Sequence, residues 1–276
     1  MLAFSSLLGN VEGQNIYRIW YDKPASYWEE ALPVGNGRIA AMVFGDPQLE
    51  QIQLNEETVS AGSPYQNYNE EAKTALPEMR RLIFEGKYEE AQNMAATKIL
   101  SQVGNEMPYQ TVGRLNIRYQ DHKKVNNYYR DLDISNAVAV ARYEVDGVEF
   151  TEETFASFTD QLVIRHIKAS KPGTINCELF FNTPMRDPKR SIYGKKGLRL
   201  EGITHGSRYF PGKVHYCADL DVKHKGGKVI TANDTLLSVQ GASELTLYIS
   251  MATNFVNYKD ISVSYTHLRA HETEAD

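Results

Sequence analysis

The stretch that decides the fold is Ala137-Val-Ala-Val-Ala-Arg-Tyr-Glu-Val-Asp-Gly-Val-Glu-Phe-Thr-Glu-Glu-Thr-Phe155. Small and apolar side chains recur at every second position up to Val145, which is the pattern of a strand with one buried face. The Asp146-Gly147 pair that follows is typical of the type I′ turn of a β-hairpin. The sequence therefore predicts antiparallel strands over Ala137–Val145 and Val148–Phe155.

The rest of the chain has the same character over most of its length. Short segments rich in β-branched and aromatic residues are separated by Gly, Pro, Asn and Asp, which favours antiparallel β-structure. Strands at this close spacing are typical of a sandwich. The further predicted strands are Leu162–Ala169, Thr174–Phe181, Leu198–Ile203, Val214–Val222, Lys228–Ile230, Leu236–Val239 and Leu245–Met251.

One region, residues 69–101, predicts helices inserted into this mainly β fold. Asn69 can cap a helix that has acidic residues in its first turn and ends at Gly86. Residues Tyr88–Leu100 continue in the same style. We expect Pro77 to lie in the first turn of a second helix, where its missing N–H is harmless. Two or three helices are therefore predicted.

Composition narrows the class of protein. The 276 residues include 30 Lys and Arg against 35 Asp and Glu, a net charge of −5, and there is no block of basic residues. Nucleic acid is therefore not expected as a partner. No run approaches the roughly 20 apolar residues of a membrane-spanning helix, so we expect no membrane span.

Few motifs for a cofactor or a metal are present. The sequence has no Gly-x-Ser-x-Gly elbow, Walker loop, dinucleotide-binding glycine pattern or His-Glu-x-x-His, and we expect no cofactor. Four potential metal ligands alternate along one strand, namely His215, Cys217, Asp219 and Asp221. The first and third are roughly 13 Å apart on a strand, which favours an ordinary outward face over a metal site. Cys177 lies on an apolar face and is expected to be a buried thiol, not the disulfide partner of Cys217.

Adjacent carboxylates occur at five places along the chain. Neighbours on a strand point to opposite faces and neighbours on a helix diverge, so none of these pairs can place both acids on one substrate bond. We expect them to lie on the solvated surface. The pairs are Glu29-Glu30, Glu56-Glu57, Glu70-Glu71, Glu89-Glu90 and Glu152-Glu153.

The two ends of the chain look unlike the rest. Met1–Leu8 is apolar without a positive start, and Val11-Glu-Gly13 offers small residues to a signal peptidase. Residues 1–13 are interpreted as the remnant of a signal peptide, which implies export to the periplasm or the extracellular space; the alternative is the frayed start of a cytoplasmic protein. Residues 263–276 resemble a translated sequencing adapter and are interpreted as an artefact.

The most distinctive segment of the sequence is Trp28–Gly45, and two further distinctive segments, Glu50–Thr58 and Ala61–Pro64, come after it along the chain. It predicts a strand entering a turn at Pro33–Gly37, an apolar strand Ile39–Phe44 and a strand back. These segments closely resemble the N-terminal β domain of glycoside hydrolase family 95, the bacterial α-L-fucosidases and their relatives. Further matches occur in the same order at Leu82–Ala91, Pro108–Gln110, Gly113–Leu115, Tyr129–Asp133, Phe155–Ser157 and Ala252–Phe255.

The resemblance implies a large antiparallel β-sandwich of the supersandwich type over residues 14–262. It also implies that the catalytic (α/α)₆ barrel, the partner of this domain, is absent from the chain. That barrel would carry the inverting hydrolysis of fucosylated oligosaccharides, so we assign no catalytic residue and no metal ligand here. Asn36, Asn55 and Glu56 are the candidates to reach the substrate mouth or the interdomain contact. The alternative for these side chains is local satisfaction of turns.

Two other functions stay open at this point. A free-standing carbohydrate-binding sandwich is compatible with the β architecture and with 17 tyrosines. An N-terminal domain of a related glycoside phosphorylase would have the same sandwich.

Overall fold

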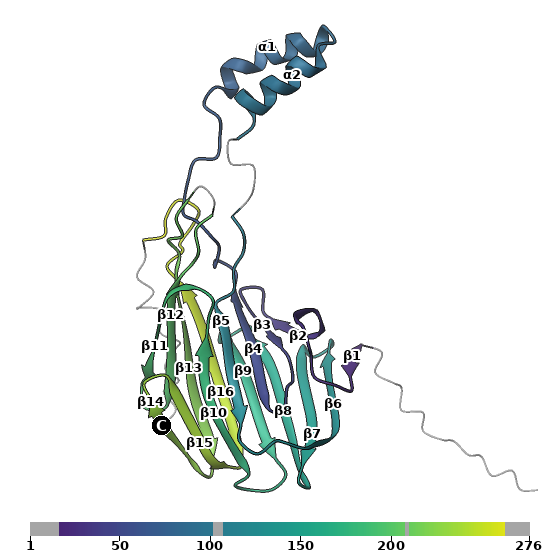
Figure 1. Ribbon diagram of the computed structural model, residues 1–276, viewed down its shortest axis with the longest axis vertical. Coiled ribbons are helices and arrows are strands. Elements are labelled where there is room, and N and C mark those ends of the chain that lie inside the picture. Colours follow the sequence, from purple (N-terminus) through teal and green to yellow (C-terminus); the bar gives the residue numbers. More distant parts are fainter. Residues whose placement is uncertain (1–16, 102–106, 208–209, 263–276) are drawn as a thin grey trace, which may run out of the picture.

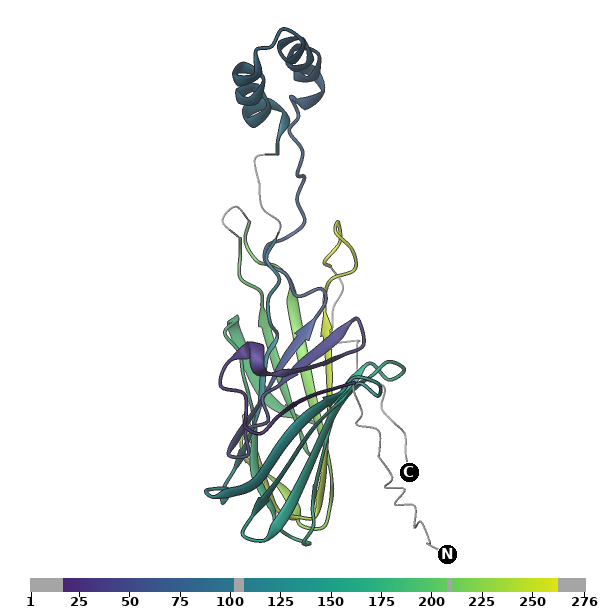
Figure 2. The same ribbon diagram turned by 90° about the vertical axis from the view of Figure 1, so that its right-hand side faces the viewer.

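The computed structural model describes residues 17–101, 107–207 and 210–262, and it consists of two sheets packed face to face with a helical hairpin beyond one end (Figures 1 and 2). The interpretations of residues 1–13 and 263–276 lie outside the described residues. The strand order is β1-β6-β7-β8-β9-β16-β13-β12-β11 in a nine-stranded sheet and β14-β15-β10-β5-β4-β3-β2 in a seven-stranded sheet.

All neighbouring strands in both sheets pair antiparallel. The mainly β sandwich is therefore confirmed. The nine-stranded sheet contains β1 (Arg18–Tyr21), β6 (Val125–Asp133), β7 (Val138–Val145), β8 (Val148–Ser157), β9 (Leu162–Ala169), β16 (Glu244–Thr253), β13 (His215–Lys225), β12 (Gly197–Ile203) and β11 (Arg186–Tyr193). The seven-stranded sheet contains β14 (Lys228–Asn233), β15 (Leu236–Ala242), β10 (Ile175–Asn182), β5 (Gly113–Tyr119), β4 (Leu49–Glu56), β3 (Ile39–Val43) and β2 (Leu32–Gly35).

The predicted hairpin forms with the expected register and turn. Val145 pairs with Val148, and the turn residues Asp146 and Gly147 have φ values of 50° and 75°. Positive φ at both positions is the requirement of a type I′ turn, which only residues such as Asp and Gly meet at low cost. The turn chemistry and the alternation together fix β7 and β8.

The predicted turn at Pro33–Gly37 is wrong in its first half. β2 runs through Pro33, which pairs with Met42 of β3, and the chain reverses only around Gly37, where φ is 94°. Proline is tolerated because β2 is the edge strand of its sheet, where a missing N–H on the open side breaks no ladder.

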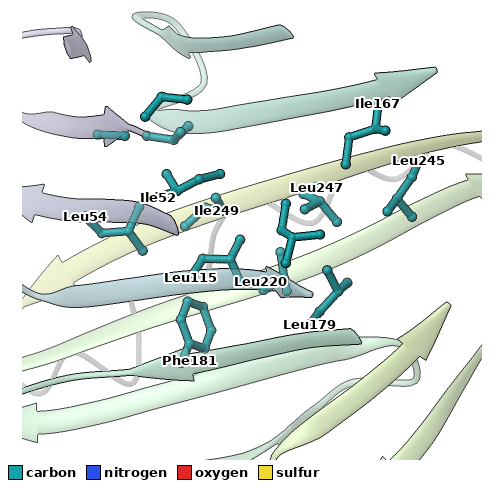
Figure 3. Close-up of a cluster of buried hydrophobic side chains, with 14 of the residues drawn as sticks. Ile52, Leu54, Leu115, Ile167, Leu179, Phe181, Leu220, Leu245, Leu247 and Ile249 are labelled. Carbon is teal, nitrogen blue, oxygen red and sulfur yellow. The ribbon is translucent and has the colours of Figure 1, made fainter. Parts of the chain in front are cut away.

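The core fills the space between the two sheets (Figure 3). Alternate residues of β4 and β16 point inward, and Ile52, Leu54, Leu247 and Ile249 are fully buried. Cys177 is buried among them and, like Cys217, is a free thiol, as predicted. Burial of this apolar surface, at about 25 cal/mol per Å², is the main force that holds the sheets together.

Two helices, α1 (Ala72–Phe84) and α2 (Tyr88–Met94), form the hairpin, and a π-helical turn over Ala95–Ile99 follows them. The Asn69 side chain accepts a hydrogen bond from the N–H of Glu71, and Gly86 ends α1 at a φ of 75°. The prediction for Pro77 is wrong, because it lies inside α1 and does not begin a second helix. Pro77 has no N–H to donate to the carbonyl of Lys73, four residues earlier in the helix. Both residues are exposed, so water can hydrogen-bond to this carbonyl instead.

Candidate functional site

Asn36 lies in the turn between β2 and β3 and joins the two sheets. Its Oδ1 accepts hydrogen bonds from the N–H groups of Arg38 at 3.0 Å and Ile39 at 2.9 Å. Its Nδ2 donates to the carbonyl of Ser157 at 2.9 Å and to Oε1 of Gln161 at 3.3 Å, both beside the turn between β8 and β9. The first two hydrogen bonds satisfy backbone N–H groups within the turn itself, and the other two connect the turn to the opposite sheet.

Glu56, the last residue of β4, is buried beside this turn. Its Oε2 accepts hydrogen bonds from the N–H of Thr58 at 2.7 Å and from the Thr58 hydroxyl at 2.6 Å. Its Oε1 lies 3.4 Å from a guanidinium nitrogen of Arg38. Burial raises the pKa of Glu56, while the hydrogen bonds from Thr58 and the charge of Arg38 act in the opposite direction. Both oxygens of the Glu56 carboxylate therefore have partners within the domain, which indicates a structural role.

Arg38 connects the two predicted residues, and the sequence reasoning missed it. Its Nε donates to Gln161 at 2.7 Å, and its Nη1 donates to the carbonyl of Met251 at 3.2 Å as well as facing Glu56. We call Asn36, Arg38, Glu56, Thr58 and Gln161 the rim cluster. The sequence Gly-Asn-Gly-Arg-Ile around Arg38, between two apolar strands, could have indicated this role. An arginine placed between two strands of buried residues needs hydrogen-bond or charged partners.

Asn55 does not join the rim cluster. β4 alternates its side chains, so Asn55 lies on the opposite face from Glu56, where its Oδ1 accepts a hydrogen bond from Gln53 at 3.4 Å. The structure thus brings together Asn36 and Glu56 and leaves Asn55 apart. A role of these three residues at a substrate mouth stays a prediction.

We expect Arg38→Met to lower the free energy of unfolding by about 1–2 kcal/mol, because the buried carboxylate of Glu56 loses its charged partner while Thr58 still donates to it. Urea unfolding followed by circular dichroism measures the change. Arg114→Met, which removes an exposed hydrogen bond to Gln51, is the matched control and should cost less than about 0.5 kcal/mol. Equal losses of stability in the two variants would contradict the role of Arg38 as the charged partner of Glu56.

A pocket of about 560 Å³ lies next to the rim cluster and shares Thr58 with it. Its walls come from the chain that leads from β4 towards α1 and from the residues after β16, among them Tyr65, Phe255 and Tyr258. Tyr65 stacks on Phe210 with 4.3 Å between ring centroids. The pocket wall therefore carries large aromatic groups. Its residues belong to loops at the end of the sandwich from which the helical hairpin rises (Figure 1).

The helical hairpin exposes large apolar side chains. Phe84 is 88% exposed, and Ile83, Tyr88 and Leu100 are exposed as well. Figure 2 shows the hairpin standing clear of both sheets, so the sandwich does not cover these groups. Large apolar side chains gathered on a protruding element are typical of an interaction surface.

The prediction that the paired carboxylates are solvated is wrong for Glu56 and Glu152. Glu152 points into the core from β8, and its carboxylate accepts hydrogen bonds from the hydroxyls of Tyr119 at 2.5 Å and Tyr143 at 2.6 Å. It also pairs with the guanidinium of Arg165. The neighbouring residue, Glu153, faces the other side of the strand, as the alternation requires.

A second acid, Glu50 of β4, completes this buried charge cluster. Its Oε2 lies 3.0 Å from a guanidinium nitrogen of Arg165, and its Oε1 accepts a hydrogen bond from the N–H of Gly45 at 3.0 Å. Burial raises the pKa of Glu50 to about 7, against the opposing charge of Arg165. Glu50, Glu152 and Arg165 are enclosed between the sheets, so they cannot contact a substrate.

The four potential metal ligands of β13 share one face, as predicted. Asp219 binds Arg199 through two hydrogen bonds of 2.7 Å, and Cys217 is buried beside it. Within residues 17–101, 107–207 and 210–262, no group of three or more His, Cys, Asp or Glu side chains is placed to hold a metal ion. In the same part of the chain, none of the helices has the length and apolar character needed to cross a membrane.

The family model described as "Glycosyl hydrolase family 65, N-terminal domain" matches residues 19–258. The chain belongs to this family. It is 31% identical over 271 residues to "Alpha-L-fucosidase 2" of Arabidopsis thaliana, covering 89% of this chain and 31% of that protein. It is also 26% identical to "Probable alpha-fucosidase A" of Aspergillus niger, covering 86% of this chain and 30% of the relative.

The chain thus spans about a third of the length of the curated relatives it matches. A solved structure, "Putative kojibiose phosphorylase from human microbiome", is similar to 91% of this chain and 34% of its own, with 10% identity and a TM-score of 0.49. The family model and the curated relatives confirm the resemblance to the N-terminal β domain of fucosidase-type glycoside hydrolases.

Proposed function

We propose that the chain is the non-catalytic N-terminal domain of an inverting α-L-fucosidase-like glycoside hydrolase of family 95, and that it packs on and supports a helical-barrel catalytic domain. The observation that carries this proposal is the extent of the match to the Arabidopsis fucosidase. It covers 89% of this chain but only 31% of that protein. The proposal places the hydrolytic machinery in the other two-thirds.

The acids of the described chain support this division. Inverting glycosidases need two carboxyl groups about 6.5–9.5 Å apart that both reach the sugar. Glu50 of β4 and Glu152 of β8 are fully or almost fully buried, and both are paired with Arg165. Their contacts indicate a structural role, so the proposed barrel would supply the acid and the base for a fucosylated oligosaccharide.

The helical hairpin and the aromatic pocket support a docking role. Phe84 lies on the hairpin, Leu100 directly follows the π-helical turn after it, Tyr258 lies at the pocket, and all three are exposed. Both features lie at one end of the sandwich (Figure 1). A helical barrel packed at this end would bury them, and burial of each large side chain would contribute about 1.5–3 kcal/mol.

The test compares the 276-residue chain with the full-length gene product on 4-nitrophenyl α-L-fucoside. We expect the full-length protein to release L-fucose with inverted configuration, seen by NMR of the first-formed anomer, and the chain alone to release none. Release by the chain alone would contradict the non-catalytic role. Release of 4-nitrophenol that requires inorganic phosphate, with fucose 1-phosphate as the sugar product, would assign the domain to a glycoside phosphorylase instead.

A further inference from the structure

A hollow lies on the outer face of the nine-stranded sheet, and one end of it borders the turn between β8 and β9 that also carries Gln161 of the rim cluster. It follows one row of cross-strand neighbours. Tyr248 of β16 pairs with Ile164 of β9 on one side and with Asp221 of β13 on the other. Asp221 pairs in turn with Gly197 of β12, and Gly197 pairs with Tyr193 of β11. Two tyrosines thus stand in one row with an acid and a glycine between them.

Gly197 is the residue of this row that lies between Asp221 and Tyr193. A Cβ at this position would lie 2.4 Å from the carbonyl oxygen of Leu220 and 3.3 Å from the ring of Tyr193, so no larger residue fits. A pocket of about 300 Å³ lies on this face of the sheet, and its lining includes both tyrosines together with Thr159 and Asp160 of the turn between β8 and β9. We call it the outer-sheet pocket.

The outer-sheet pocket is lined by three acids, Asp160, Asp219 and Asp221, whose charge is partly offset by Lys223 in the lining and by Arg199 beside it. Asp219 is bound by Arg199 through two hydrogen bonds. Lys223 lies two residues from Asp221 on the same face of β13, with its Nζ 5.3 Å from the centre of the Tyr248 ring. A strongly charged ligand would gain little here, whereas a neutral polar ligand meets both hydrogen-bond donors and acceptors.

The lining has two chemically different parts. Tyr248, Leu162 and Ile164 supply an aromatic and aliphatic surface. Asp221, Ser250 and Thr159 supply a carboxylate and two hydroxyls around it. A pyranose ring has the same division, since one face presents C–H groups and the edge presents hydroxyls. Apolar walls with a few polar groups are typical of small-molecule sites, and this volume is at the lower end of their range.

We propose that the outer-sheet pocket binds a neutral pyranose unit of a glycan, with its C–H face on Tyr248 and its hydroxyls on Asp221 and Ser250. This goes beyond the proposed supporting function, because it assigns a binding activity to the described chain itself. The occupant is a single sugar residue, since the volume of about 300 Å³ leaves no room for a longer buried segment.

The test titrates the 276-residue chain with L-fucose, D-galactose and D-glucose and follows amide chemical shifts by NMR. We expect at least one sugar to bind with a dissociation constant on the order of 1 mM and to shift amides of β13 and β16. Tyr248→Ala should weaken binding about tenfold, and Tyr248→Phe should retain it, because the ring supplies the contact. Asp221→Asn should weaken binding about tenfold through loss of a charged acceptor.

Tyr88→Ala is the matched control, because it removes an exposed tyrosine of the helical hairpin and should bind like the parent chain. Thermal melting of each variant separates lost binding from lost folding. If Tyr248→Ala does not fold, the two single variants Tyr248→Phe and Asp221→Asn still test the proposal, because only Asp221→Asn is expected to weaken binding. No binding of any of the three sugars would overturn the proposal. Equal binding by the parent and Tyr248→Ala, or shifts confined to other strands, would overturn it too. These outcomes leave the fucoside test of the full-length protein unaffected.

Discussion

Arg165→Met is expected to lower the free energy of unfolding by about 3–5 kcal/mol. Arg165 is the cation between Glu50 and Glu152, and all three side chains are fully or almost fully buried. Methionine fills similar space without charge, so the variant leaves two carboxylates in the core without their cation. The penalty for an unpaired buried charge exceeds the worth of the ion pair itself. A domain of this size should lose about 10 °C in melting temperature.

Urea unfolding at neutral pH measures the effect of Arg165→Met. Arg118→Met is the matched control, because Arg118 pairs with Glu178 on the surface, where such pairs contribute about 0–1 kcal/mol. Combining Arg165→Met with Glu50→Gln and Glu152→Gln should recover much of the loss, since no buried charge of the cluster then remains. A loss in Arg165→Met no larger than in Arg118→Met would refute the charge-compensation role.

The fold was predictable where the inner face is uniformly apolar and the turns are chemically distinctive. β9 matches its predicted range, and β7 and β8 differ from theirs by one or two residues. Strands β1, β5, β6 and β11 were not predicted from the sequence. β11 is an edge strand whose residues are mostly exposed, so polar side chains hide its pairing. β5 does alternate, with Leu115 and Ile117 buried, and its pattern could have been recognised.

The buried charges were not predictable from adjacency alone. Glu152 and Glu153 lie on opposite faces of β8, as the alternation of a strand predicts. The pairing of Glu152 with Arg165 of β9, which also binds Glu50 of the opposite sheet, depends on how the two sheets stack and is not encoded in the local pattern. Arg38 was missed for the same reason, since its partner Gln161 lies 123 residues away in the sequence.

Glu50→Gln is expected to flatten the dependence of stability on pH. Burial raises the pKa of Glu50 from an ordinary 4.5 to about 7 in the folded chain. Between these values the folded chain keeps a proton that the unfolded chain has lost, so stability falls as pH rises through this window. At about 1.4 kcal/mol per pKa unit, the loss from pH 4 to pH 8 amounts to roughly 3 kcal/mol.

Glutamine cannot ionise, so the variant loses this component while other acids titrate as before. The measurement is the free energy of unfolding at several values between pH 4 and pH 8, and the decisive quantity is the difference in slope between Glu50→Gln and the parent. A constant offset is expected as well, because the glutamine amide cannot accept from both Gly45 and Arg165 as the carboxylate does. Glu178→Gln, at a surface pair with Arg118, is the control and should keep the parent slope. Parallel profiles for Glu50→Gln and the parent would show that Glu50 is ionised throughout, with Arg165 outweighing the cost of burial.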